Sequence, residues 1–139
     1  MNQSAFRKLP ALCCALLALA GSSAALSADL SKSSGAQLFR QYCASCHGRG
    51  GEGDGPVAGF FKLSPPDLTL IARRSGGTFP AERVRRIVDG REVVAPHGPR
   101  DMPVWGMQFA MMTDDAAMSD AAIGRVVEYL QSIQKVPAR

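Results

Sequence analysis

Tyr42-Cys43-Ala44-Ser45-Cys46-His47-Gly48 is the stretch that decides the fold of this 139-residue chain. Cys43 and Cys46 are three residues apart, so on a helix both thiols lie on one face. His47 follows directly and can carry its imidazole under a flat ligand that the two thiols hold. Cys-x-x-Cys-His is the attachment signature of a covalent haem, with the histidine as an iron ligand. The expected cofactor is therefore one covalently bound haem c.

Three other roles for the two cysteines agree less well with the rest of the chain. A structural zinc site needs four nitrogen or sulfur ligands, and only His97 is left to join Cys43, Cys46 and the badly placed His47. A thioredoxin-like redox pair is expected near a βαβ pattern, which the sequence lacks. A disulfide would close only a four-residue segment and would constrain little.

The sixth position of the iron needs its own candidate, and Met102 is the best one. It lies 55 residues after His47, in the proline-bordered loop Asp101-Met102-Pro103-Val104-Trp105-Gly106. A thioether opposite a histidine raises the reduction potential and blocks oxygen or substrate. His97 is the rival ligand, and an open sixth site is the third possibility. We expect Trp105 to form an apolar wall near the haem.

The N-terminus has the pattern of a secretory signal peptide. Arg7 and Lys8 precede the apolar run from Leu9 to Ala20, and small residues follow up to Ala28. Residues 1–28 are therefore expected to be a signal peptide, cleaved at about residue 25–28, and residues 29–139 to form one domain. An uncleaved membrane anchor is the alternative. Loss of the leader lowers the net charge from +4 to +2, which is too small to suggest nucleic acid.

Apolar spacing and capping signals predict an all-α fold with long connecting loops. Helices are expected over about 34–46, where Ser34 to Gln37 has the form of a capping box, and over 67–74. Two more are expected, one from Pro80 to the stop at Gly90 and one that opens at Ser119 or Asp120. The glycine-rich stretch 48–59, which could pass close to a flat ligand, and the stretch 91–106 are predicted to be loops.

Several motifs together resemble the class I cytochrome c family, in particular its small bacterial single-haem type related to the subunits of haem-copper oxidases. The segments that carry the resemblance are 42–48, Gly51-Glu52-Gly53-Asp54-Gly55-Pro56, Pro66-Asp67-Leu68-Thr69, 102–106 and Tyr129-Leu130. The resemblance implies helices around one haem, with the first and last helices crossing. It further implies close approach at Gly35 and Gly124, with Phe39 and Tyr129 packing at the crossing.

The same resemblance implies that a loop carbonyl accepts a hydrogen bond from the second nitrogen of the ligand histidine. Pro56 is the first candidate for that carbonyl, and Pro65 and Pro66 are alternatives. The other methionines, Met107, Met111, Met112 and Met118, are expected to fill the core.

The expected function is electron transfer in the periplasm rather than enzymatic catalysis, because no nucleophile, base and orienting acid recur in the chain. A haem-based gas sensor or peroxidase-like enzyme with an open sixth position is the alternative, as is an electron-accepting subunit of a periplasmic dehydrogenase. We expect a monomer whose partners are a redox donor and a redox acceptor. We expect no nucleic acid partner, and contact with a membrane only through protein partners unless the signal peptide stays uncleaved. Seven arginines against three acids over 73–100 suggest a basic rim that steers an acidic partner.

Overall fold

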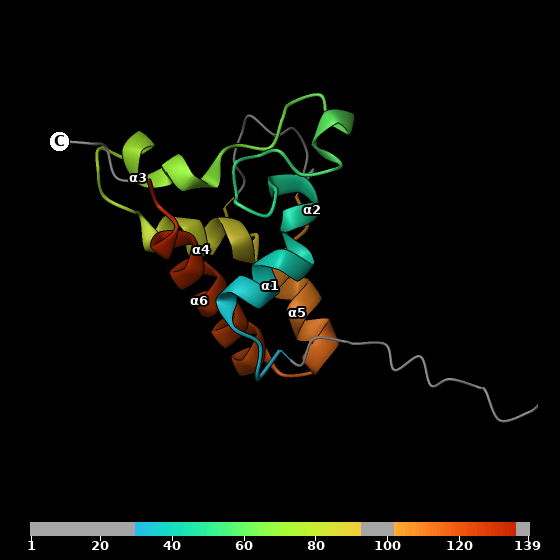
Figure 1. The fold of residues 1–139 in the computed structure, drawn as a ribbon. Coiled ribbons are helices and arrows are strands. Elements are labelled where there is room, and N and C mark those ends of the chain that lie inside the picture. Colours follow the sequence, from blue (N-terminus) through green and yellow to red (C-terminus); the bar gives the residue numbers. More distant parts are fainter. Residues whose placement is uncertain (1–29, 93–101, 136–139) are drawn as a thin grey trace, which may run out of the picture.

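The chain folds as a set of helices joined by long loops, and the computed structural model describes residues 30–92 and 102–135 (Figure 1). No strand occurs within these ranges, which confirms the all-α prediction. None of the helices in this part of the chain is long and apolar enough to cross a membrane. The predicted leader, residues 1–28, lies outside the described residues.

The helix predicted over 34–46 is present but is divided at Cys43. The helix α1 spans Gly35–Tyr42, and the short helix α2 spans Ala44–His47. Ser34 begins α1 with the expected capping box: its hydroxyl accepts from the backbone of Gln37, and the Gln37 side chain accepts from the Ser34 N–H. The haem signature therefore stands at a helix junction, with Cys43 ending one helix and beginning the next.

The next predicted helices also form. The loop after α2 contains the 3₁₀ turn η1 (Ala58–Phe60). The segment 67–74 then forms the 3₁₀ turn η2 (Leu68–Leu70) and the short helix α3 (Ile71–Arg74). The helix α4 spans Ala81–Asp89, begins after Pro80 and ends at Gly90, whose φ of 90° is left-handed and suits a glycine. Val84 and Val88 bury their side chains, as the apolar spacing predicts.

The region after Met102 differs from the prediction. Residues 105 and 106, expected in an extended loop, begin the helix α5 (Trp105–Thr113), in which only Phe109 is buried. The final helix α6 (Ala116–Ser132) starts earlier than Ser119, because the Asp115 carboxylate accepts hydrogen bonds from the next turn at 2.8 and 3.2 Å. Ser119 is instead buried inside α6, and its hydroxyl donates to the Gly106 carbonyl at 2.9 Å.

The methionines of α5 are not core residues, contrary to the prediction. The exposed fractions are 55% for Met107, 74% for Met111 and 54% for Met112, whereas Met118 on α6 packs against the core as expected. The apolar residues of α5 run almost around the whole helix, so the sequence carries no stripe that indicates which side is buried.

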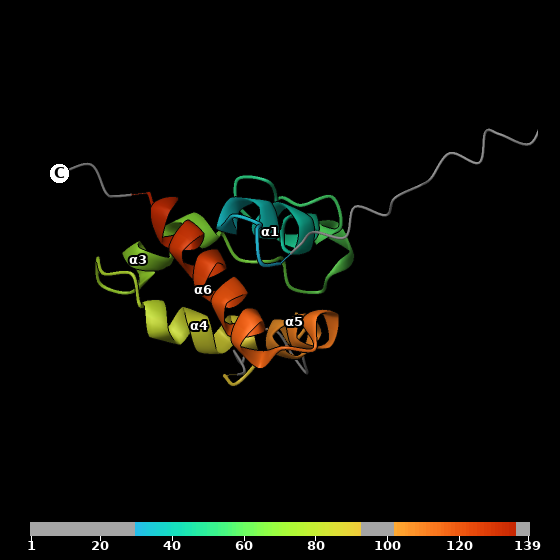
Figure 2. The same ribbon diagram turned by 90° about the horizontal axis from the view of Figure 1, so that it is seen from below.

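The helix α6 organises the molecule, because it packs against α1, α4 and α5 (Figure 2). The crossing of α1 and α6 confirms the expectation drawn from the family resemblance. The rings of Phe39 and Tyr129 pack there with centroids 5.2 Å apart, and Gly35 lies against the backbone of Arg125. Gly124 does not contribute to this crossing, since the nearest atom to its missing side chain belongs to Arg85 on α4.

Candidate functional site

A cavity of about 510 Å³ lies between the haem signature, α4 and the segment from Met102 to Trp105. Its size falls in the range of small-molecule and cofactor sites. Most of its wall is apolar and includes Phe39, Leu68, Ile71, Val84, Ile87 and Leu130. The wall is therefore suited to a large, flat and mostly apolar ligand.

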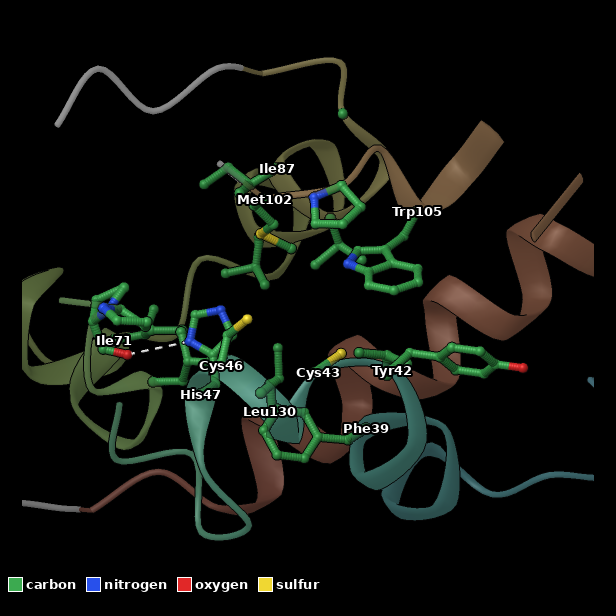
Figure 3. Close-up of a pocket in the computed structure, with 18 of the residues that line it drawn as sticks. Phe39, Tyr42, Cys43, Cys46, His47, Ile71, Ile87, Met102, Trp105 and Leu130 are labelled. Atoms are coloured by element: carbon green, nitrogen blue, oxygen red, sulfur yellow. Dashed lines mark hydrogen bonds between the residues drawn. The ribbon is translucent and has the colours of Figure 1, made fainter. Parts of the chain in front are cut away.

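The residues that the sequence singled out meet at this cavity. Cys43, Cys46 and His47 lie along one side, while Met102 and Trp105 lie along the facing side (Figure 3). The fold thus brings Met102 opposite the haem signature, although Met102 lies 55 residues after His47 in the sequence. The rival ligand His97 lies outside the described residues.

The proline carbonyl beside His47 is that of Pro66, not that of Pro56. The His47 Nδ1 lies 3.4 Å from the Pro66 carbonyl oxygen, and the other ring nitrogen faces the cavity (Figure 3). Pro56 is exposed in the loop after α2 and does not line the cavity. The preference for Pro56 was therefore wrong, and one of the two alternatives occupies the position.

The glycine-rich loop approaches protein backbone rather than the cavity. Gly53 donates to the His47 carbonyl at 2.8 Å, and Val57 donates to the Ser45 carbonyl at 3.1 Å, so the loop satisfies carbonyls at the end of α2. A side chain on Gly53 would place its Cβ 2.3 Å from the Pro65 carbonyl oxygen. The loop glycines therefore let the Pro65-Pro66 segment close over the haem signature.

The thiols of Cys43 and Cys46 are both free in the structure. Burial, together with a smaller effect of the neighbouring Cys46 thiol, raises the pKa of the Cys43 thiol to about 12. A redox-active Cys-x-x-Cys pair instead lowers the pKa of its attacking thiol. Nor does any group of three His, Cys, Asp or Glu residues in ranges 30–92 and 102–135 form a candidate metal site.

Asp67 stabilises the turn that follows Pro66. Its carboxylate accepts from the Thr69 N–H at 2.8 Å and from the buried Thr69 hydroxyl at 2.6 Å. Burial raises the pKa of Asp67, but the two hydrogen bonds from Thr69 and the charges of Lys135 and Arg74 outweigh it and lower this pKa below its ordinary value. The folded protein therefore favours the ionised carboxylate.

We expect Asp67→Asn to lower the free energy of unfolding by about 1 kcal/mol at neutral pH, because asparagine keeps the acceptor oxygen but loses the charge that strengthens both hydrogen bonds. The pKa of Asp67 is lowered by folding, so its contribution is complete above the unfolded pKa and is lost as the pH falls through the folded pKa. The difference between the variant and the parent should accordingly disappear in acid. Urea unfolding between pH 7 and pH 3 would measure it, with Glu128→Gln on the exposed face of α6 as the control.

Most arginines of the predicted basic rim are engaged in ion pairs. Glu92 binds Arg83 at 2.8 Å and Arg86 at 3.0 Å, and Asp120 binds Arg85 at 2.5 Å. Arg91 pairs with Asp89. Glu92 and Asp89 were already counted among the three acids of 73–100, so Asp120 is the one acid in these pairs that offsets a further positive charge of the segment.

The residues present fit an iron porphyrin. Two thiols and an imidazole face a thioether across an apolar cavity, and sulfur and imidazole nitrogen are donors that iron accepts. Arg74 and Arg83 also line the cavity and offer cationic groups to the acidic groups of such a cofactor.

Three contributions to the site were not predicted from the sequence. Ile87 on α4 lines the cavity next to Met102. Ile71 and Arg74 come from a helix too short to show an apolar face. The run Ser64-Pro65-Pro66-Asp67 indicates only that one segment ends and another begins just before the helix that carries Ile71 and Arg74.

A comparison with known families gives an independent assignment. The sequence profile of the family described as Cytochrome c matches residues 33–134, which include every helix of the structure. No curated protein and no solved structure matched the chain. The match covers most of the chain, and the cavity and its donor groups suit the cofactor of that family. The chain therefore belongs to the cytochrome c family, whose members bind haem c and transfer electrons.

Proposed function

We propose that this chain is an exported electron carrier with one haem, bonded covalently to Cys43 and Cys46 and ligated axially by His47 and Met102. The observation that carries the proposal is the position of Met102. It lines the same cavity as the haem signature, from the facing side, although a long stretch of sequence separates the two. Two donors on facing sides are what a six-coordinate iron requires.

The bound haem would supply an iron that alternates between the ferrous and ferric states. The chain's own residues would hold and tune it. The two cysteines would fix one edge of the ring, and the Pro66 carbonyl would orient His47 and raise its basicity. The thioether of Met102 would occupy the remaining axial position, while Trp105 and the apolar wall would exclude water.

An absorption spectrum of the purified holoprotein tests the cofactor. We expect a low-spin c-type spectrum in the reduced protein, and we expect the haem to remain with the chain after denaturation. A pyridine assay against the protein concentration should give one haem per chain. Release of all the haem on denaturation would contradict covalent attachment through Cys43 and Cys46.

Carbon monoxide separates the carrier from the gas sensor or peroxidase-like alternative. Both alternatives need an exchangeable sixth position, whereas Met102 would close it. We expect the reduced protein to bind little carbon monoxide at neutral pH. Rapid binding of one carbon monoxide per haem would refute methionine ligation and favour the open-site functions.

The proposed location is the periplasm, because the leader has the charge and apolar pattern of a secretory signal. The proposed partners are redox proteins, one donor and one acceptor, that a monomeric carrier meets in turn. A relationship to the subunits of haem-copper oxidases is part of the proposal and rests on the joint resemblance of segments 42–48, 51–56, 66–69, 102–106 and 129–130. Intact mass measurement of the periplasmic protein would test export and cleavage near residues 25–28. Copurification with a stoichiometric partner would favour a dehydrogenase subunit.

A further inference from the structure

The segment from Pro66 to Ala72 carries the carbonyl that faces His47, yet it has little regular structure of its own. It contains η2, with three residues, and enters α3, with four. Helical turns this short do not hold their own conformation in water. The position of the Pro66 carbonyl therefore depends on bonds from this segment to the rest of the protein.

The side chain of Gln134 makes several of these bonds. Its amide nitrogen donates to the Leu68 carbonyl at 2.8 Å and to the Leu130 carbonyl at 2.7 Å. Its amide oxygen accepts from the Ala72 N–H at 2.8 Å. One side chain thus joins the end of α6 to two points of the segment that follows Pro66.

Backbone groups complete the attachment. The Lys135 N–H donates to the Thr69 carbonyl at 2.8 Å, and the Leu68 N–H donates to the Gly51 carbonyl at 2.6 Å. These bonds remain when a side chain is changed. Gln134 therefore offers a way to loosen the segment selectively, because its three hydrogen bonds can be removed while the backbone bonds stay.

We propose that Gln134 is a positioning residue for the axial histidine, because it holds the Pro66 carbonyl against Nδ1 of His47 and so helps to set the reduction potential. The inference rests on the proposed function, in which His47 is an iron ligand. A carbonyl that accepts from Nδ1–H makes the other imidazole nitrogen more basic and favours ferric iron. At 3.4 Å this contact is long, so a further small displacement would nearly abolish it.

The test compares two glutamine-to-methionine variants, one at Gln134, which follows α6, and one at Gln131 in the last turn of α6. Gln134→Met keeps the length of the side chain but removes all three hydrogen bonds. We expect the ferric–ferrous equilibrium to shift threefold to tenfold toward ferrous iron, a rise in potential of up to about 59 mV. We also expect faster solvent exchange of the His47 Nδ1–H in the reduced protein, measured by NMR. Gln131→Met, at an exposed position, should change neither quantity.

The outcomes separate positioning from simple stabilisation. Gln134→Asn is a neutral variant that is one methylene shorter and should move both quantities in the same direction, which keeps the test available should the methionine variant fail to fold. Unchanged potential and unchanged Nδ1–H exchange, with only the free energy of unfolding reduced, would overturn the inference and leave the carrier function intact. A parent protein without a low-spin haem spectrum would instead refute the proposed function, and the inference with it.

Discussion

Met102→Ala is expected to convert the low-spin reduced spectrum to a high-spin one and to open the iron to carbon monoxide. Alanine cannot reach the metal, so the sixth position would pass to water or remain open. Loss of the thioether should also lower the reduction potential by on the order of 0.2 V, a fraction of the ~0.8 V range that axial ligands span. Absorption spectroscopy and a potentiometric titration of the purified variant would measure both effects.

The chain supplies a matched control on α5. Met107 is 55% exposed and lies only five residues further along, so Met107→Ala should leave the spectrum, the potential and carbon monoxide binding unchanged. A low-spin spectrum that persists in Met102→Ala would assign the sixth position to another residue. His97 would then be the first to replace, since it is the other histidine of the chain.

Gly35→Ala is expected to destabilise the fold strongly, because it adds a methyl group where α1 crosses α6. A Cβ at Gly35 would lie 1.9 Å from the carbonyl oxygen of Arg125 and 3.0 Å from the Cβ of Tyr129. The first clash is with backbone, so α1 and α6 must separate. We expect a decrease of roughly 3 kcal/mol in the free energy of unfolding, the upper end of the range for overpacking. Denaturant unfolding of the holoprotein followed by circular dichroism would measure it.

Gly59→Ala is the corresponding control, because no atom lies within 4 Å of the Cβ that would be added there. Its effect should stay within about 0.5 kcal/mol, with a slight gain from the reduced freedom of the unfolded chain. Equal stability of the Gly35 variant and the parent would mean that the α1–α6 crossing tolerates separation.

The methionines illustrate where prediction from the sequence succeeded and where it failed. Met102 stands beside Pro103 and was predicted to serve the same cofactor as the haem signature. It lines the cavity on the side that faces that signature, and its role as an iron ligand stays a prediction. Met107 and Met111 carry the same side chain, but they were expected to be buried and are exposed. The sequence of α5 is apolar on nearly every side, so only the packing of Phe109 determines which side faces inward.

Pro66 illustrates a second kind of limit. Three prolines could have offered a carbonyl to His47, and the one nearest in sequence, Pro56, was preferred. The closure of the glycine loop decides between them, since Gly53 brings the Pro65-Pro66 segment onto the haem signature. The contact between Pro66 and His47 joins residues 19 apart in the sequence through a loop of irregular backbone. Such a loop has no periodic sequence pattern from which the contact could be predicted.

The haem signature by itself determined the haem cofactor and, with the apolar spacing around it, an all-α fold, and it predicts His47 as the iron ligand. These features depend on residue type and on separations of three or four residues, which helix geometry converts directly into proximity. The facing position of Met102, the Pro66 carbonyl and the anchoring of its segment by Gln134 were decided only in the tertiary structure. They depend on how α6 crosses α1 and α4, and close packing between distant segments sets that crossing.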